Sequence, residues 1–124
     1  MGHERIERLA ADLEGAVGES LRTVAIGDLD DLDHEVAYMR PDVDARYDRE
    51  EYGRIVRDVL LEQVASAQQA DLFAIGALEY TVRIFEEGIN VVGRTNDSVF
   101  FVGLDPDPEA IPRVVECCRA VDRS

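Results

Sequence analysis

The spacing of apolar residues along the chain predicts three helices and five strands. Near both termini and in the middle, apolar residues recur every three or four positions, which is the period of an amphipathic helix. Elsewhere they alternate with polar residues, as in a strand that is buried on one face. The predicted elements are a helix at 3–20, strands at 21–26 and 35–39, a helix from 48 to 73–76, strands at 78–84, 89–94 and 98–104, and a final helix from 107.

The long middle helix has the clearest boundaries. Asp48 is a good N-cap residue, and Glu51 three positions later completes an approximate capping box. Gly76 can supply the left-handed residue that ends the helix. The stretch before it, Pro41 to Tyr47, is predicted to be a loop. The apolar stripe of the helix is Tyr52, Ile55, Val56, Val59, Leu60, Val64 and Ala67.

The strand-rich half lies between residues 77 and 104. A turn at Glu86–Gly88 and a second turn at Thr95–Asp97 join three strands into hairpins. The last strand has a continuous apolar centre, Val99 to Val102, which indicates burial on both faces. After it, Asp107 is expected to cap the final helix, with Pro108 at its first position.

The element order is therefore α-β-β-α-β-β-β-α. Short connections within each β block favour antiparallel hairpins. Each apolar helix stripe must find a partner surface, so the helices are expected to cover a five-stranded antiparallel sheet. The chain has 124 residues, which suits one domain with one core. The fold class is α+β, in a single domain spanning residues 1–124.

The charge composition adds the most to the prediction made from the apolar pattern. The chain has 27 acidic and 13 basic residues, a formal net charge of -14, and every basic residue is Arg. Molar salt would screen the resulting repulsion. This composition resembles the proteins of salt-in halophilic archaea. Such a surface argues against nucleic-acid partners and anionic membranes. With neither an apolar signal core nor a membrane-length apolar run, a cytoplasmic location is expected.

The element order resembles the roadblock fold and its profilin-like and longin-like relatives over essentially the whole chain. That resemblance implies homodimers that act as scaffolds or regulators of small GTPases. The run from Leu78 to Glu86 (LEYTVRIFE), followed by Leu104 to Asp107 (LDPD), is similar to a run in small uncharacterised haloarchaeal proteins. Neither resemblance supplies a catalytic residue.

No residue pattern points to catalysis, a metal or a cofactor, and none is expected. Asp28, Asp30, Asp31 and Asp33 suggest calcium, but an EF-hand loop starting at Asp28 would need Gly and Glu where Asp33 and Met39 stand. The sequence leaves open whether this loop holds a cation at a fixed site. His3 and His34 form no zinc pattern. Adjacent cysteines such as Cys117 and Cys118 rarely form a relaxed disulfide, because a helix would point them apart, and no C-x-x-C spacing supports a redox or metal pair.

The candidate partner-binding residues are Tyr52, Tyr80, Arg83 and Phe85, provided the aromatic side chains are exposed. Arg83 lies mid-strand on the face opposite Tyr80, where it either pairs with Glu79 or another neighbour, or anchors a ligand or protein partner. Gly93 and Gly103 indicate either a closely packed helix or a small pocket. Two functions remain: a dimeric interaction module whose protein partner is a small GTPase or signalling protein, and a small-ligand sensor resembling PAS or profilin-like domains.

Overall fold

The structure is a computed structural model that describes the backbone of residues 2–94 and 98–123 and their side chains except at 2, 3, 67, 68, 71 and 123. Its elements closely follow the predicted order. They are α1 (Gly2–Val17), η1 (Gly18–Ser20), β1 (Leu21–Asp28), β2 (His34–Met39), α2 (Pro41–Asp44), α3 (Arg49–Phe73), β3 (Tyr80–Phe85), β4 (Gly88–Arg94), β5 (Ser98–Leu104), η2 (Pro108–Ala110) and α4 (Ile111–Arg123). The predicted turn at Thr95–Asp97 lies outside the described residues.

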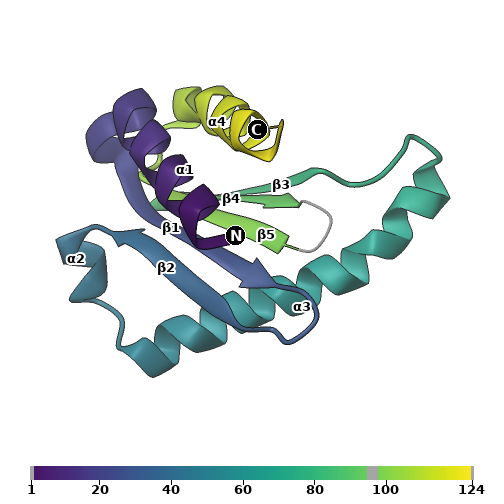
Figure 1. Ribbon diagram of the computed structural model, residues 1–124, viewed down its shortest axis with the longest axis horizontal. Helices are drawn as coiled ribbons and strands as arrows, with labels where there is room; N and C mark the ends of the chain where they lie inside the picture. Colours follow the sequence, from purple (N-terminus) through teal and green to yellow (C-terminus); the bar gives the residue numbers. More distant parts are fainter. Residues whose placement is uncertain (1, 95–97, 124) are drawn as a thin grey trace.

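The five strands form one antiparallel sheet in the order β2-β1-β5-β4-β3. Helices α1 and α4 lie side by side on one face, and α3 crosses the other (Figure 1). The central strand β5 is buried on both faces, as its apolar run predicts. The two ends of the sheet, β2 and β3, each have one backbone edge that no described strand covers.

Two apolar cores hold these layers together. The larger core lies between the sheet and the α1–α4 pair and includes Leu9, Leu13, Val91 and Phe100. The smaller core lies between the sheet and α3 and is made of Ala25, Tyr52, Val56, Leu60, Val92, Val99 and Phe101. Burying these side chains is the main favourable term in folding, at about 1.5–3 kcal/mol for each large residue.

The start of α3 confirms the predicted capping box. The Asp48 side chain accepts a hydrogen bond from the Glu51 backbone N–H at 2.7 Å, and the Glu51 carboxylate accepts one from the Asp48 N–H at 3.3 Å. The helix ends at Phe73, within the predicted range of 73–76, but the left-handed residue at its end is Ala74 (φ 54°) instead of Gly76. Gly76 also has positive φ, but in the loop that follows.

The buried stripe of α3 departs from the prediction in the second half of the helix. Val64 is 51% exposed, whereas Gln63 is only 1% exposed. The buried face continues from Leu60 to Gln63, three positions later, so Val64 at the next position faces solvent, and the last turns of α3 run past the sheet (Figure 1). The Gln63 side chain donates a hydrogen bond to the Thr81 hydroxyl at 3.4 Å, and the Gln63 backbone carbonyl accepts one from the Arg94 guanidinium at 3.1 Å. The region predicted to be a loop before α3 contains the short helix α2.

Neither predicted reason for the strand glycines holds. A Cβ atom on Gly93 would lie 2.8 Å from the Tyr80 ring, and one on Gly103 would lie 2.7 Å from the Thr23 methyl group. Both neighbours are side chains of adjacent strands, so these glycines accommodate neither a helix nor a pocket. The close helix approach occurs instead at Gly27, where a Cβ would lie 2.7 Å from Leu60 of α3.

Candidate functional site

Exposed apolar side chains concentrate at the β3 end of the sheet, where Val82 and Ile84 lie on the α1–α4 side and the others lie on or near α3. Among the described residues, all but one of the large exposed apolar side chains come from α3, the loop after it and β3. Leu72 and Ile75, at the protruding end of α3, are 81% and 85% exposed. We call this group the α3–β3 surface. Its members are Leu61, Val64, Leu72, Phe73, Ile75, Val82, Ile84 and Phe85.

The backbone of β3 offers hydrogen-bonding groups next to this surface. In an antiparallel pair, alternate residues direct their N–H and C=O groups toward the same neighbour. The Arg94 N–H donates to the Glu79 carbonyl at 2.8 Å, which sets this alternation for β3 and β4. The backbone groups of Tyr80, Val82 and Ile84 therefore face away from β4, toward the open edge.

Arg83 lies at the rim of a groove between α3 and the β3–β4 hairpin. It projects on the face opposite Tyr80, as predicted, and its guanidinium pairs with Glu62 of α3 instead of Glu79. The groove has a volume of about 350 Å³ and includes Ile55, Phe85 and Asn90. Because its arginine is held by a carboxylate on an exposed rim, this groove differs from the enclosed pocket that a small-ligand sensor needs.

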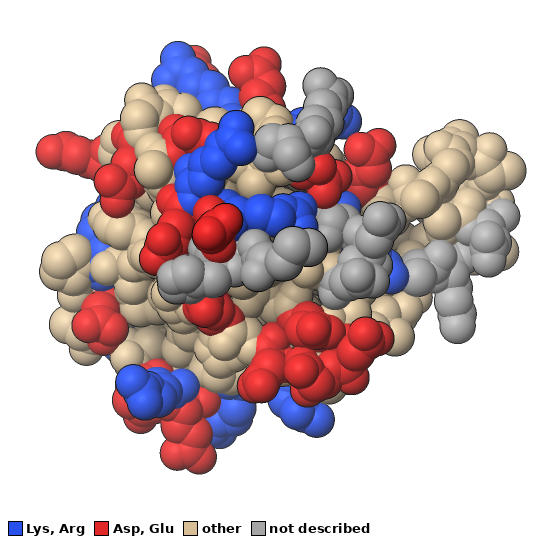
Figure 2. Space-filling view, viewed as in Figure 1, with Lys and Arg blue, Asp and Glu red and all other residues tan. Residues whose placement is uncertain are grey.

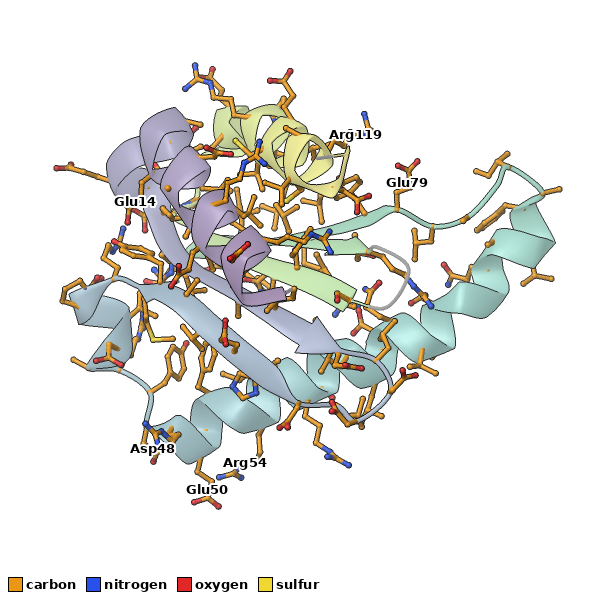
Figure 3. All side chains as sticks on the ribbon, in the orientation of Figure 1. Glu14, Asp48, Glu50, Arg54, Glu79 and Arg119 are labelled. Carbon is orange, nitrogen blue, oxygen red and sulfur yellow. The ribbon has the colours of Figure 1, made fainter. Side chains whose placement is uncertain are left out.

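The two candidate tyrosines are not exposed, although exposure was the condition for a partner-binding role. Tyr52 is buried, with its hydroxyl 3.0 Å from the Thr23 hydroxyl, and this burial raises its pKa. Tyr80 is half-buried, and the Arg119 guanidinium lies 5.5 Å from its ring centroid. Arg119 also approaches Glu79 at 3.8 Å, and both residues are labelled in the upper right of Figure 3. Phe85 is exposed, so it is the aromatic candidate that fits a contact surface.

Sequence reasoning missed the most connected charge, Arg40. Its guanidinium donates five hydrogen bonds: two to Asp105 (2.8 and 2.9 Å), two to Asp42 (2.6 and 3.1 Å) and one to the Glu19 carbonyl (2.7 Å). Arg40 thus joins the ends of β2 and β5 to the turn before β1. These contacts hold the pKa of both carboxyl groups below the usual range. No sequence signal marks Arg40, because its partners lie up to 65 positions away.

The acidic turn between β1 and β2 is organised by its own side chains. The Asp28 carboxylate accepts from the Asp30 N–H at 2.7 Å, and the Asp31 carboxylate accepts from the Asp33 N–H at 2.9 Å. Leu32 occupies the left-handed region at φ 60°. Across the described residues, no group of three His, Cys, Asp or Glu side chains has the arrangement of a metal site.

The two cysteines differ in reactivity. Cys118 is buried in the larger core, which raises its pKa to about 12, and burial also raises the pKa of the half-buried Cys117. Thiolate is the reactive form of cysteine.

In the native protein near pH 8, iodoacetamide is therefore expected to label Cys117 slowly and Cys118 at least about 100-fold more slowly than an unfolded cysteine. Mass spectrometry of native and denatured samples measures the labelling of each cysteine, and Cys117→Ser is the control that reports on Cys118 alone. Faster labelling of Cys118 than of Cys117 in the native protein would contradict this prediction.

Comparison with known proteins assigns the chain to a family. Residues 7–123 match a family described as a domain of unknown function (DUF7522). The chain belongs to this family. No curated protein matches the chain. None of the described helices is long and apolar enough to cross a membrane.

Solved structures place this DUF7522 chain in the roadblock fold. The gliding protein MglB from Thermus thermophilus superimposes with a TM-score of 0.68 at 17% identity, over 96% of this chain and 89% of that one. MglB in a tetrameric arrangement gives 0.67 at 17%, over 96% and 88%. A Roadblock/LC7 domain from Streptomyces avermitilis gives 0.64 at 12%, over 91% of each chain. The predicted roadblock-like α+β fold is confirmed.

Proposed function

We propose that this protein is a non-catalytic interaction module that works as a homodimer through its α3–β3 surface. The observation that supports this most directly is the concentration of exposed apolar side chains on that surface. Exposed apolar patches of this kind mark protein–protein contact sites. The protruding end of α3, with Leu72 and Phe73, has no surface of its own chain beneath it (Figure 1) and would cover a second copy.

The open edge of β3 suggests how two copies would join. A two-fold axis would pair β3 with itself in antiparallel fashion and extend the sheet. Centring the axis on Arg83 would set two like charges directly opposite each other, which is unfavourable. Centring it on Val82 places Tyr80 opposite Ile84 of the second copy and Thr81 opposite its Arg83. The latter register also uses the outward backbone groups of Val82 for the central pair of hydrogen bonds.

The dimer would present a larger surface to a protein partner. The roadblock resemblance suggests a small GTPase or another signalling protein for this role, and such a partner could contact Phe85 at the end of the α3–β3 surface and Arg83 beside it. One structural neighbour is MglB in a tetrameric arrangement, which is consistent with self-association in this fold. The net charge of -14 with no lysine suggests that the module works in the salt-rich cytoplasm of a halophilic archaeon.

Substituting exposed residues of this surface tests the proposal. Ile84→Asp and Phe73→Ser change side chains that are 62% and 67% exposed, so each variant is expected to keep its fold. A two-fold interface contains each residue twice, so each change is expected to raise the dimer dissociation constant by about 100-fold or more. Light scattering after size-exclusion chromatography, in molar salt and over a range of protein concentrations, measures the effect.

Val36→Asp provides the matched control. Val36 is the one large exposed apolar residue outside the α3–β3 surface among the described residues, and it lies on β2 at the other end of the sheet. This variant is expected to dimerise normally. A wild-type protein that stays monomeric at every concentration, or a Val36→Asp variant as impaired as Ile84→Asp, would contradict the proposal.

A further inference from the structure

The second open edge of the sheet, β2, borders a groove that the proposed dimer leaves free. The groove has a volume of about 460 Å³ and lies between β2 and the start of α3. Its lining residues are His34, Val36, Met39, Asp44, Tyr47, Asp48, Arg49 and Tyr52. The centroids of the His34 and Tyr52 rings lie 5.9 Å apart. Because β2 and β3 are opposite ends of the sheet, both edges can be occupied at once.

The backbone of β2 faces outward at the same residues that line the groove. The Asp28 N–H donates to the Asp33 carbonyl at 2.8 Å, so Asp33 and Glu35 direct their backbone groups toward β1. His34 and Val36 therefore direct theirs to the open edge. A strand added here would gain main-chain hydrogen bonds at His34 and Val36 and would lay alternate side chains over the groove.

A bulge extends this arrangement along β2. The register with β1 shifts between Val24 and Ala25, which leaves one extra residue in β2. Because of this extra residue, Met39 joins His34 and Val36 along the groove although three positions separate it from Val36. The Arg40 N–H donates to the Arg22 carbonyl at 2.8 Å, so the backbone groups of Met39 also face the open edge. The usable edge thus spans the whole of β2.

Charge around the groove selects the occupant. Asp44 and Asp48 line it at the α3 end, where the N-cap contact to the Glu51 N–H holds the pKa of Asp48 below its usual range. Asp28, Asp30, Asp31 and Asp33 lie at the other end of β2. Figure 2 shows acidic side chains gathered over the β1–β2 connection. Arg49 is the one permanently positive side chain among the lining residues. The excess of acidic over basic side chains around the groove favours a segment in which positively charged and apolar side chains alternate.

We propose that the β2 edge and its groove bind an extended, positively charged segment of another protein, which adds a sixth strand to the sheet. The apolar floor, made by Val36, Met39 and Tyr52, takes one set of alternate side chains, while the acidic rim pairs with the positive ones. This site does not depend on self-association, because β3 lies at the opposite end of the sheet.

A seven-residue peptide that alternates arginine and valine is a suitable probe in about 0.2 M salt, where charge pairs at the rim are still felt. Amide hydrogen exchange is the readout. Binding is expected to slow exchange at His34 and Val36 by about 10-fold or more and to leave Glu35, already bonded to β1, unchanged. A peptide with proline in place of valine keeps the charge but lacks the N–H groups that the valines would donate to His34 and Val36, so it is expected to give no such protection.

Two pairs of variants test the contribution of charge. The double variant Asp44→Asn, Asp48→Asn removes both carboxylates from the groove, and asparagine preserves the N-cap of α3. It is expected to weaken peptide binding by about 5- to 10-fold. Asp12→Asn with Glu14→Gln makes the same change in net charge on α1, where both side chains are exposed (Glu14 is labelled in Figure 3). This control pair is expected to bind the peptide normally.

Three results would overturn the proposal. The first is equal weakening of peptide binding by both double variants, which would indicate that the net charge of the protein attracts the peptide. The second is protection at Tyr80, Val82 and Ile84 in place of β2, which would assign the peptide to the β3 edge. The third is equal binding of the proline peptide. Because Ile84→Asp alters only the β3 edge, a peptide that still protects His34 and Val36 in that variant supports the proposal even if dimerisation fails.

Discussion

In about 0.01 M salt the free energy of unfolding of this protein is expected to be on the order of 8 kcal/mol lower than in about 1 M salt. That difference is comparable to the whole stability of an ordinary domain, about 5–15 kcal/mol. The protein is therefore expected to lose its fold, or most of its stability, in dilute buffer. The cause is its net charge of -14, carried on a compact surface.

For a net charge spread over a sphere, the repulsion grows as the radius of the sphere shrinks. A folded domain of this length has a radius of gyration of about 14 Å, against about 36 Å when unfolded. Folding therefore brings the same charges closer together, at an electrostatic cost that depends on screening. The Debye length is about 30 Å in 0.01 M salt, longer than the folded radius, and about 3 Å in 1 M salt, so repulsion across the molecule matters only in the dilute buffer.

Urea unfolding followed by circular dichroism, at several potassium chloride concentrations and two protein concentrations, measures this effect. Repeating the series with tetramethylammonium chloride separates screening from binding of small cations to the aspartates of the β1–β2 turn. Equal stabilisation by both salts is the expected result. Unchanged stability in dilute buffer would contradict both the charge argument and the inference of a salt-rich cytoplasm.

Arg40→Ala is expected to lower the free energy of unfolding by about 2–3 kcal/mol in molar salt. The Arg40 side chain is 21% exposed and satisfies all five of its N–H donors within the protein. Its loss leaves the Asp105 carboxylate and the Glu19 carbonyl without their strongest partner at a junction of three chain segments. Arg40→Lys keeps the charge without the planar fork and is expected to recover less than half of the loss.

Arg113→Ala is the control, because it makes the same change in net charge but removes a single exposed hydrogen bond, to the Ala16 carbonyl at 3.3 Å. It is expected to cost about 0.5 kcal/mol. Urea titrations of the three variants and the wild type give the comparison. Equal losses in Arg40→Ala and Arg113→Ala would show that net charge, and not the junction, is responsible.

The same junction has a defined pH dependence. The pKa of Asp105 is lowered in the folded state by its hydrogen bonds to Arg40. A carboxyl group with a depressed folded pKa contributes stability that is present above its unfolded pKa and is lost as the pH falls through the folded value. The difference between wild type and Arg40→Ala is therefore expected to be full near pH 7 and to shrink below about pH 4.

The elements of this fold were predictable because each depends on local pattern. The period of apolar residues in α1, α3 and α4 and the double burial of β5 follow from the side chains within each segment. The Asp48 capping box depends on contacts three positions apart, and it formed as predicted. The end of α3 fell within its predicted range, but Ala74 took the left-handed position predicted for Gly76, because the path the chain must follow to reach β3 outweighed the preference of glycine for left-handed backbone.

The candidate site was less predictable, because it depends on where elements end relative to one another. Arg83 was identified as an important charge, yet its partner is Glu62 on a helix that only the tertiary structure brings near. Tyr52 is buried between α3 and the sheet, as its place in the apolar stripe predicts, so it does not meet the condition of exposure, while Leu72 and Ile75 are the most exposed large apolar side chains among the described residues. The sequence contains no sign that α3 would run past the sheet.

The sequence by itself determined the α+β class, the order of the elements, most of their boundaries and the acidic character of the surface, because these follow from residue type and short-range spacing. The tertiary structure alone decided which strands lie at the edges, which apolar side chains stay uncovered and which carboxylates Arg40 joins. Those features depend on contacts between residues far apart in the chain, and such contacts leave no local pattern in a single sequence.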